Sequence, residues 1–385
     1  MDPNKTAAKS VGLYLHIPFC RSKCLYCDFC SFVGKDEEKM RLYTAALCRD
    51  LAQYAPRLRD HTVDTVYFGG GTPTLLPPAL LASVLDCVFS HYLISADAEI
   101  TAECNPATAD EAAFSVLRRA GFNRLSIGVQ SANSDELRAI GRRHRFSDAE
   151  RTVWQAKRAG FDNLSADVMF GLPLQTKESY LHTLEQVCAL PVTHLSAYAL
   201  TLEEGTPLCR LVDEGRVQIP DEEETEAMYF GGIEYLKSRG LAQYEISNFA
   251  RAGYESRHNL KYWYGHPYLG LGVAAHSDLF GERFGNSYEI DAYISGEDVT
   301  EERSRPDERE RKNEYLMLRL RLCEGIDEGE FSDLFGASFW ESYKECLTPY
   351  LERGYLIRKD GRCAMTPRGF YISNHILSDL LDFPD

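Results

Sequence analysis

Strand-like and helical patterns alternate through the first 240 residues of this 385-residue chain, and this alternation constrains its fold more than any other feature. The strand-like runs are rich in β-branched and aromatic residues and fall at 11–17, 63–68, 98–102, 124–128, 163–169 and 194–200. Stretches with apolar residues at helical spacing separate them and fall at 37–59, 78–90, 109–120, 134–140, 147–159 and 176–189. A regular strand–helix alternation predicts an α/β fold with a parallel sheet.

Distinctive polar and glycine residues stand where these predicted strands end. The second strand runs into Gly69-Gly70-Gly71-Thr72, and Glu103, Gln130 and Asp167 lie at the ends of the next three. In a β/α barrel the active site is assembled at this edge from several strands, whereas a doubly wound sheet gathers its signals at one switch point. We therefore expect a partial (β/α)6 TIM-like barrel with its site at the carboxyl ends of the strands.

Four cysteines follow the first predicted strand within eleven residues: Cys20, Cys24, Cys27 and Cys30. A zinc site would use four ligands, which Cys30 or His16 could complete. A redox pair of Cys24 and Cys27 lacks a thioredoxin-like context. Three close thiolates could instead hold three irons of an iron–sulfur cubane and leave the fourth iron open to a small molecule. The spacing alone leaves these three alternatives open.

The composition excludes some classes of protein. With 42 basic and 58 acidic residues the formal net charge is −16, which argues against a non-specific nucleic-acid binder. Residues 1–10 hold no apolar signal-peptide core, and no apolar run is long enough for a membrane span, so we expect a cytoplasmic protein. In that reducing compartment we expect the remaining cysteines to be single, buried thiols: Cys48, Cys87, Cys104, Cys188, Cys209, Cys323, Cys346 and Cys363.

Three regions divide the chain. Residues 1–240 form the predicted barrel, and residues 241–300, rich in Tyr, Gly and His, contain short strand-like pieces that extend it. The charged segment 300–311 is typical of a linker or an exposed helix start. Residues 301–385 form a C-terminal unit whose helices and short strand pair resemble a winged helix. It lacks a basic recognition helix, so we expect it to pack on the barrel and not to bind DNA.

The segment His16-Ile-Pro-Phe-Cys20-x3-Cys24-x-Tyr26-Cys27 resembles the signature of radical S-adenosylmethionine (SAM) proteins. The resemblance implies that Cys20, Cys24 and Cys27 hold a [4Fe–4S] cluster. It also implies that the amino and carboxylate groups of SAM chelate the fourth iron, and that an electron from the cluster splits SAM into methionine and a 5′-deoxyadenosyl radical. Cys30 becomes a bystander in this interpretation.

Further segments resemble SAM-binding positions in the coproporphyrinogen-oxidase branch of these proteins. The implied roles are Arg142 to the SAM carboxylate, because a guanidinium fork binds both oxygens, and Glu103, Gln130 and Asp167 to the amino and ribose groups. The Gly-Gly motif is implied to bind the methionine amino group. The full set of cofactor-binding candidates is Tyr14, Tyr26, Gly70, Gly71, Thr72, Glu103, Gln130, Arg142 and Asp167.

A histidine motif, His258-Asn259-Leu260-Lys261-Tyr262-Trp263, lies in the predicted barrel extension. A lone histidine among tyrosines is usually a packed, hydrogen-bonded residue. However, this motif resembles the one that separates the heme chaperones of the branch, called HemW, from the true oxidases, and the resemblance implies that His258 contacts heme. Histidine is a common axial ligand of heme iron.

Two further features favour a heme chaperone over an oxygen-independent coproporphyrinogen III oxidase. Only 19 residues precede Cys20, where the oxidases carry a long arm, and Phe29 stands where they place a fourth cysteine. The chaperone interpretation implies heme, an acceptor heme protein that is respiratory in type, and an electron donor for the cluster. The alternatives are the oxidase and a zinc-stabilised scaffold without SAM chemistry. A homodimer is an open alternative to a monomer.

Overall fold

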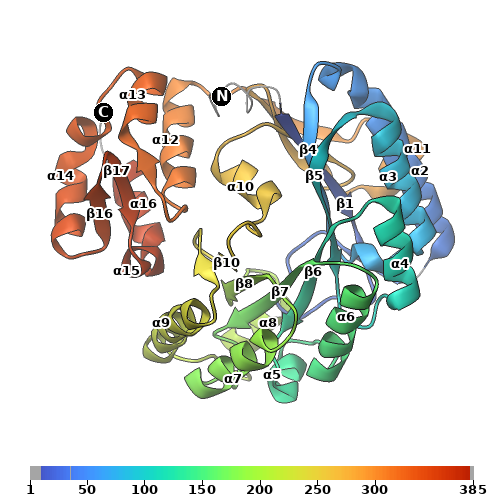
Figure 1. Cartoon of the computed structure of the whole chain (residues 1–385), viewed down its shortest axis with the longest axis horizontal. Helices are drawn as coiled ribbons and strands as arrows, with labels where there is room; N and C mark the ends of the chain where they lie inside the picture. Colours follow the sequence, from blue (N-terminus) through green and yellow to red (C-terminus); the bar gives the residue numbers. More distant parts are fainter. Residues whose placement is uncertain (1–9, 35, 382–385) are drawn as a thin grey trace.

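The computed structural model describes residues 10–34 and 36–381 and is built around one large curved sheet (Figure 1). Twelve strands form this sheet in the order β14-β13-β12-β11-β1-β4-β5-β6-β7-β8-β10-β9. The six central strands are β1 (Ser10–Ile17), β4 (Thr62–Gly70), β5 (Leu93–Cys104), β6 (Arg124–Gln130), β7 (Asn163–Phe170) and β8 (His194–Ala199). They are parallel and adjacent in chain order, without the reversal of a doubly wound sheet. The predicted partial (β/α)6 barrel is confirmed.

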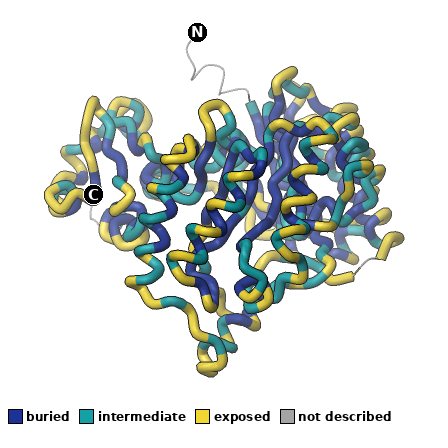
Figure 2. Tube along the Cα trace, turned by 60° about the horizontal axis from the view of Figure 1, so that its bottom comes forward, coloured by how far each residue is buried: buried dark blue, intermediate teal, exposed yellow. Residues whose placement is uncertain are grey.

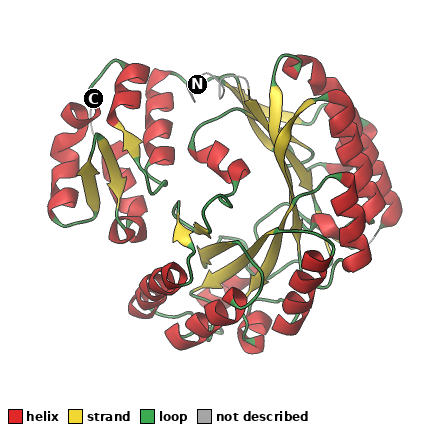
Figure 3. Cartoon of the chain, in the orientation of Figure 1, coloured by secondary structure: helices red, strands yellow, loops and turns green. Residues whose placement is uncertain are grey.

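Helices cover the outer face of this sheet (Figures 1 and 3). They are α2 (Glu37–Tyr54), α3 (Pro78–His91), α4 (Glu111–Ala120), α5 (Ser134–Ala139), α6 (Phe146–Arg158) and α7 (Lys177–Cys188). Asp36, Asp110 and Thr176 cap α2, α4 and α7 by accepting backbone N–H groups. The strands between them are mostly buried, and buried chain, dark blue, fills the middle of the molecule in Figure 2. No helix of the described residues is long and apolar enough to cross a membrane.

The region after residue 240 extends the sheet at both ends. β9 (Ala242–Gln243) and β10 (Asn248–Ala250) join beside β8. β11 (Tyr268–Leu271) lies parallel to β1, and an antiparallel run of β12 (His276–Leu279), β13 (Glu282–Asn286) and β14 (Thr300–Ser304) continues from it. The expectation of a linker or helix start at 300–311 was wrong for its first half, because 300–304 pairs with β13. The second half does begin a helix, α12 (Glu308–Arg319), with a capping box at Asp307.

The C-terminal elements form a separate layer beside the barrel (Figure 1). They are α12, β15 (Ile326–Asp327), α13 (Glu328–Phe335), α14 (Phe339–Glu352), β16 (Leu356–Lys359), β17 (Arg362–Met365), α15 (Pro367–Tyr371) and α16 (Ser373–Leu381). The backbone N–H of Ile246 donates to the carbonyl of Arg321 at 2.9 Å, and the Arg319 guanidinium lies 4.7 Å from the Tyr264 ring centroid. This unit therefore packs on the barrel extension. The division at residues 240 and 300 stays a proposal.

Two cysteines that the sequence pattern treats as single are paired. Cys48 of α2 and Cys87 of α3 form a disulfide, with 5.9 Å between their Cα atoms. The expectation of single thiols was wrong here, because adjacent packing of two helices brings together residues 39 positions apart. The other ten cysteines are free.

Candidate functional site

The cysteine loop lies at the carboxyl end of β1. Cys20 ends β2 (Phe19–Cys20), which pairs with β3 (Phe32–Val33) and closes the loop at its base. The backbone N–H of Leu25 donates to the carbonyl of Ile140 at 3.0 Å, and Leu25 in turn accepts from the N–H of Leu208 at 2.9 Å. These bonds hold the middle of the loop over the strand ends, so that the cysteines stand at the edge where the sequence predicts the site.

Cys20, Cys24 and Cys27 are half-buried and close enough to influence one another. Burial raises the pKa of the Cys27 thiol, and charge on Cys24 and Cys20 raises it further. Bound iron would reverse this cost, because a coordinating thiol is deprotonated outright. Among the described residues, no three His, Cys, Asp or Glu side chains converge on one point as ligands of a single ion would. This observation does not separate the zinc alternative from the cluster, and cluster ligation stays a prediction.

The glycine run places bare backbone against the cysteine loop. Gly70 has a φ of +107°, and a Cβ there would lie 2.5 Å from the His16 ring. A Cβ on Gly71 would lie 2.7 Å from the Phe19 carbonyl oxygen. Both positions need glycine for this close approach. Next to them, the Thr72 hydroxyl lies 3.6 Å from the Cys20 sulfur, which joins the second strand end to the first.

Glu103 turns its carboxylate toward this glycine run. One oxygen accepts from the Tyr67 hydroxyl at 2.9 Å and the other from the backbone N–H of Gly70 at 3.1 Å. Burial raises the pKa of Glu103 to about 7, and the nearby Asp167 adds to this rise. An amino group bound here would favour the ionised carboxylate. Tyr14 lies beside the carboxylate, with its ring stacked on Tyr67 at 6.2 Å between centroids.

Arg142 reaches the same edge from the loop after α5. Its guanidinium donates to Asn105 Oδ1 and, at 3.0 Å, to the hydroxyl of Tyr26 in the cysteine loop. Its buried Nε has no partner among the described residues. Charge on Cys24 acts on this guanidinium, so the cation stands beside the thiols. An arginine left partly unpaired in a buried position fits an anionic ligand such as a carboxylate.

Gln130 and Asp167 complete the ring of strand ends. Gln130 adopts a φ of +67°, and its buried Oε1 has no partner among the residues that the structure describes. A Cβ on Gly128 would lie 2.9 Å from Asn105 Oδ1 and 3.1 Å from Gln130 Nε2, so these polar groups converge above a bare backbone. Asp167 accepts from the Ser126 hydroxyl at 3.1 Å, and burial raises the pKa of Asp167.

The structure brings the SAM-binding candidates together and adds residues that sequence reasoning missed. Asn105 accepts from Arg142 and donates to the Thr72 hydroxyl at 2.7 Å, so it connects two candidates. Tyr67 orients Glu103. Asn105 carried a usable signal, since it follows Glu103 directly at a strand end. Tyr67 carried none, because a tyrosine inside a strand pattern is ordinary.

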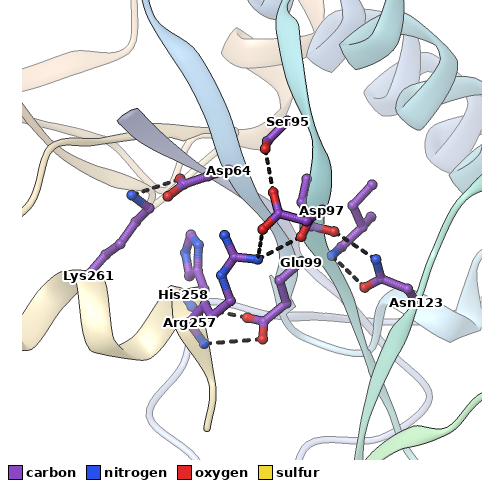
Figure 4. A network of polar contacts seen from close by, with 10 residues as sticks. Asp64, Ser95, Asp97, Glu99, Asn123, Arg257, His258 and Lys261 are labelled. Atoms are coloured by element: carbon purple, nitrogen blue, oxygen red, sulfur yellow. Dashed lines mark hydrogen bonds and ion pairs between the residues drawn. The ribbon is translucent and has the colours of Figure 1, made fainter. Parts of the chain in front are cut away.

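The His258 motif folds as the short helix α10 (Arg257–Trp263), where the sequence pattern predicts strand-like pieces. Glu99 of β5 accepts the backbone N–H groups of Arg257 and His258 at 3.1 and 3.0 Å, and Lys261 pairs with Asp64 at 2.8 Å (Figure 4). These contacts fasten α10 across the inner face of β4 and β5.

His258 itself is 1% exposed. Its Nδ1 lies 2.8 Å from the Thr65 hydroxyl and its Nε2 lies 2.9 Å from the Tyr262 hydroxyl. Burial lowers the pKa of His258 to about 3, so the ring is neutral. As placed, the imidazole has no free nitrogen for a ligand. The predicted direct contact of His258 with heme stays untested. In this conformation His258 is a packed, hydrogen-bonded histidine, the alternative to a heme contact.

A cavity of about 360 Å³ opens above these residues. It is lined at one side by the SAM-binding candidates Tyr14, Gly70 and Glu103 and at the other by Tyr262, the partner of His258. The cysteine loop contributes its rim through Phe29 and Cys30. The candidate SAM site and the histidine motif therefore border the same space.

The chain matches the Radical SAM superfamily over residues 14–187 and the HemN C-terminal domain over residues 307–372. It is 32% identical over 376 residues to a protein of Bacillus subtilis named heme chaperone HemW, with 96% of this chain and 98% of the relative covered. The chain belongs to the HemW family. A second HemW, from Haemophilus influenzae, is 33% identical, with 95% of this chain and 97% of the relative covered.

Two other proteins are similar to this chain. Coproporphyrinogen III oxidase (HemN) from Escherichia coli, described as a radical SAM enzyme, superimposes with a TM-score of 0.84 over 99% of this chain and 93% of that one. At 22% identity this likeness concerns the fold. A zebrafish (Danio rerio) mitochondrial protein named radical S-adenosyl methionine domain-containing protein 1 is 38% identical, with 71% of this chain and 62% of the relative covered.

HemW membership within the radical SAM superfamily implies a [4Fe–4S] cluster and SAM as cofactors, and the residues present fit them. Three neighbouring thiols, a carboxylate beside bare glycine backbone and a partly unpaired buried arginine meet at one edge of the sheet. When bound, the cluster supplies an electron to SAM. The protein's own contribution would be to hold the cysteine loop over the strand ends and to offer the Glu103 carboxylate and the Arg142 guanidinium to ligand groups of opposite charge.

Proposed function

We propose that this protein is a heme chaperone, which binds heme and delivers it to an acceptor heme protein. The main support is sequence similarity: this chain is about 32% identical to a protein named heme chaperone over nearly the full length of both chains. The His258–Trp263 motif supports it, because Tyr262 of this motif lines the cavity that borders the candidate SAM site. In this proposal heme binds against the surface of the motif, next to the cofactor.

We propose that Cys20, Cys24 and Cys27 ligate the cluster and that Cys30 does not. Arg142 binds the SAM carboxylate and Glu103 its amino group. The remaining contacts to SAM come from Tyr14, Tyr26, Gly70, Gly71, Thr72, Gln130 and Asp167. The convergence of these groups on one edge, with buried atoms of Arg142 and Gln130 left without partners among the described residues, supports this assignment.

The same proposal includes the acceptor of heme, the electron donor of the cluster and the location of the protein. The acceptor is a respiratory heme protein, and a separate electron donor reduces the cluster. The site acts in the cytoplasm; ten free cysteines favour a reducing compartment, whereas the Cys48–Cys87 disulfide does not. Since all the site residues described above come from one chain, the proposal holds for a monomer and for a homodimer.

A parallel assay tests the proposed function against its alternative. Protein reconstituted anaerobically with iron and sulfide is incubated with heme, and separately with coproporphyrinogen III, SAM and dithionite. We expect saturable heme binding and no loss of carboxyl groups from coproporphyrinogen by mass spectrometry. Decarboxylated product would contradict the chaperone proposal and support an oxidase, whose fold this chain shares. A colourless protein that holds one zinc would contradict both.

A further inference from the structure

A second cavity, of about 510 Å³, adjoins the one beside the candidate SAM site. It lies between the hairpin of β12 and β13 and helix α12, where the C-terminal unit meets the barrel extension. The two cavities share three lining residues: Tyr262, Tyr268 and His276. Each volume lies within the usual range of ligand pockets, roughly 300–1,000 Å³. The shared residues therefore stand at the junction of a two-chambered space.

His276 differs from His258 in every respect that matters for ligation. It is exposed, it opens onto both cavities, and neither ring nitrogen has a hydrogen-bond partner among the described residues. The ring lies against Gly285 of the neighbouring strand, where a Cβ would be 2.8 Å from Nδ1. Glycine at 285 therefore leaves this imidazole the room it occupies. The histidine motif, in contrast, holds its imidazole 1% exposed with both nitrogens bonded.

The aromatic walls around His276 suit a flat, aromatic ligand. Tyr262 and Tyr268 pack edge to face at 4.6 Å, and Tyr288 and Phe29 stand at the rim of the smaller chamber, 63% and 69% exposed. Aromatic side chains of this kind pack well against a porphyrin face. The larger chamber contains the carboxylates of Asp278, Glu302 and Glu314, and Arg283 pairs with two of them, Asp278 and Glu314. It also contains Arg303, which lies 3.9 Å from Glu282. A half-exposed guanidinium so loosely paired suits the carboxylates of a tetrapyrrole.

We propose that His276 is the protein ligand to heme iron, with the porphyrin lying in the two chambers between the β12–β13 hairpin and α12; this proposal rests on the proposed heme-chaperone function. His258 is then a positioning residue. It fixes Tyr262, which lines both chambers, and does not touch the iron. The iron lies beside the cavity of the SAM-binding candidates Tyr14, Gly70 and Glu103, so heme and SAM occupy neighbouring parts of one space.

Titration of the full chain with hemin and with iron-free protoporphyrin IX, followed by absorption and EPR spectra, tests the proposal. The variants are H276A, H276Q and H258A, with H182A as a control because His182 is exposed on α7. We expect H276A and H276Q to lose the imidazole-ligated spectrum and to bind hemin about 10-fold more weakly or worse. Their affinity for protoporphyrin IX should stay within about twofold, since that ligand offers no iron. Added free imidazole should restore the ligated spectrum in H276A.

Two outcomes overturn the proposal. Unchanged hemin affinity and spectrum in both His276 variants, with loss of the ligated spectrum in H258A, would return the ligand role to the motif histidine. A wild-type protein that binds no hemin would remove the proposed function itself, and the inference with it. Circular dichroism of each variant verifies that the fold is retained, and H276Q keeps a polar side chain at the strand position if H276A does not fold.

Discussion

The hydroxyl of Tyr262 lies 2.9 Å from Nε2 of His258, inside the His258–Trp263 motif. The other ring nitrogen of His258 meets Thr65 of β4. One imidazole therefore fastens a short helix to the barrel and sets the position of a tyrosine at the cavity wall. The histidine of the motif therefore has a structural role that does not require direct ligation of iron.

Replacement of His258 with Ala should lower the free energy of unfolding by about 2–4 kcal/mol, because it opens a buried cavity and leaves the buried hydroxyl of Thr65 and the half-buried hydroxyl of Tyr262 without this partner. Denaturant unfolding followed by circular dichroism measures the change. The exposed control H182A should change stability by less than about 0.5 kcal/mol. Equal stability of H258A and the wild type would show that the buried position of this ring is not the native one.

Replacement of Arg142 with Lys should weaken SAM binding by about 10- to 100-fold, because a point charge replaces a fork that can bind both carboxylate oxygens. Calorimetric titration of SAM into the reconstituted protein measures this. Arg143, the exposed neighbour in the chain, provides the matched control R143K, which should bind SAM as the wild type does. Equal losses in both variants would assign the effect to the loop as a whole.

Replacement of Cys30 with Ser should leave iron and sulfide at four each per chain, whereas C24S should lose the cluster. Both cysteines lie in the same half-buried loop, so a general disturbance of the loop would affect them alike. Iron analysis and the dithionite-bleached absorption of the reconstituted protein are the readouts. A loss of iron in C30S would mean that this cysteine is a ligand.

The contribution of Glu103 to the stability of the cofactor-free protein should fall as pH rises from about 4.5 to about 7, because Glu103 binds its proton more tightly when folded. Burial raises the pKa of Glu103 to about 7, so Glu103 loses its proton at lower pH in the unfolded state than in the folded state. Above pH 7 the folded state therefore carries the full free-energy cost of the buried carboxylate. The cost is up to about 3 kcal/mol. Denaturant titrations of E103Q and the wild type at each pH isolate this contribution as the difference between the two proteins. Glu245, whose pKa burial raises to about 7, and buried histidines such as His258, whose pKa burial lowers, contribute alike to both. An unchanged dependence of stability on pH in E103Q would contradict the assignment.

The six central strands, the helices between them and the edge where the candidate site residues gather were predictable, because each follows from a local pattern. Gly69-Gly70-Gly71 and Glu103 each follow or end a strand-like run, so they indicate where the strand ends and which edge of the sheet that end belongs to. Parallel strands in chain order then bring these ends together without further information. The fold of the six central strands needed no knowledge of long-range contacts.

The environment of His258 was not predictable, since its partners lie far away in the sequence. Glu99 accepts the N–H of His258 across 159 positions, and Thr65 meets its ring across 193. The Cys48–Cys87 disulfide was not predictable either, because the two cysteines are far apart in the sequence and only the packing of α2 on α3 brings them together. The exposed His276 resembles any polar residue at a strand start, so only the cavities on both of its sides draw attention to it.

The most direct test of heme delivery is the rate of heme transfer from the loaded protein to a heme-free cytochrome b in membrane vesicles, followed by absorption as acceptor concentration rises. A chaperone that delivers heme by contact predicts a rate that increases with acceptor concentration. A rate that stays constant and equals spontaneous heme release would contradict delivery and reduce the protein to a heme-binding one.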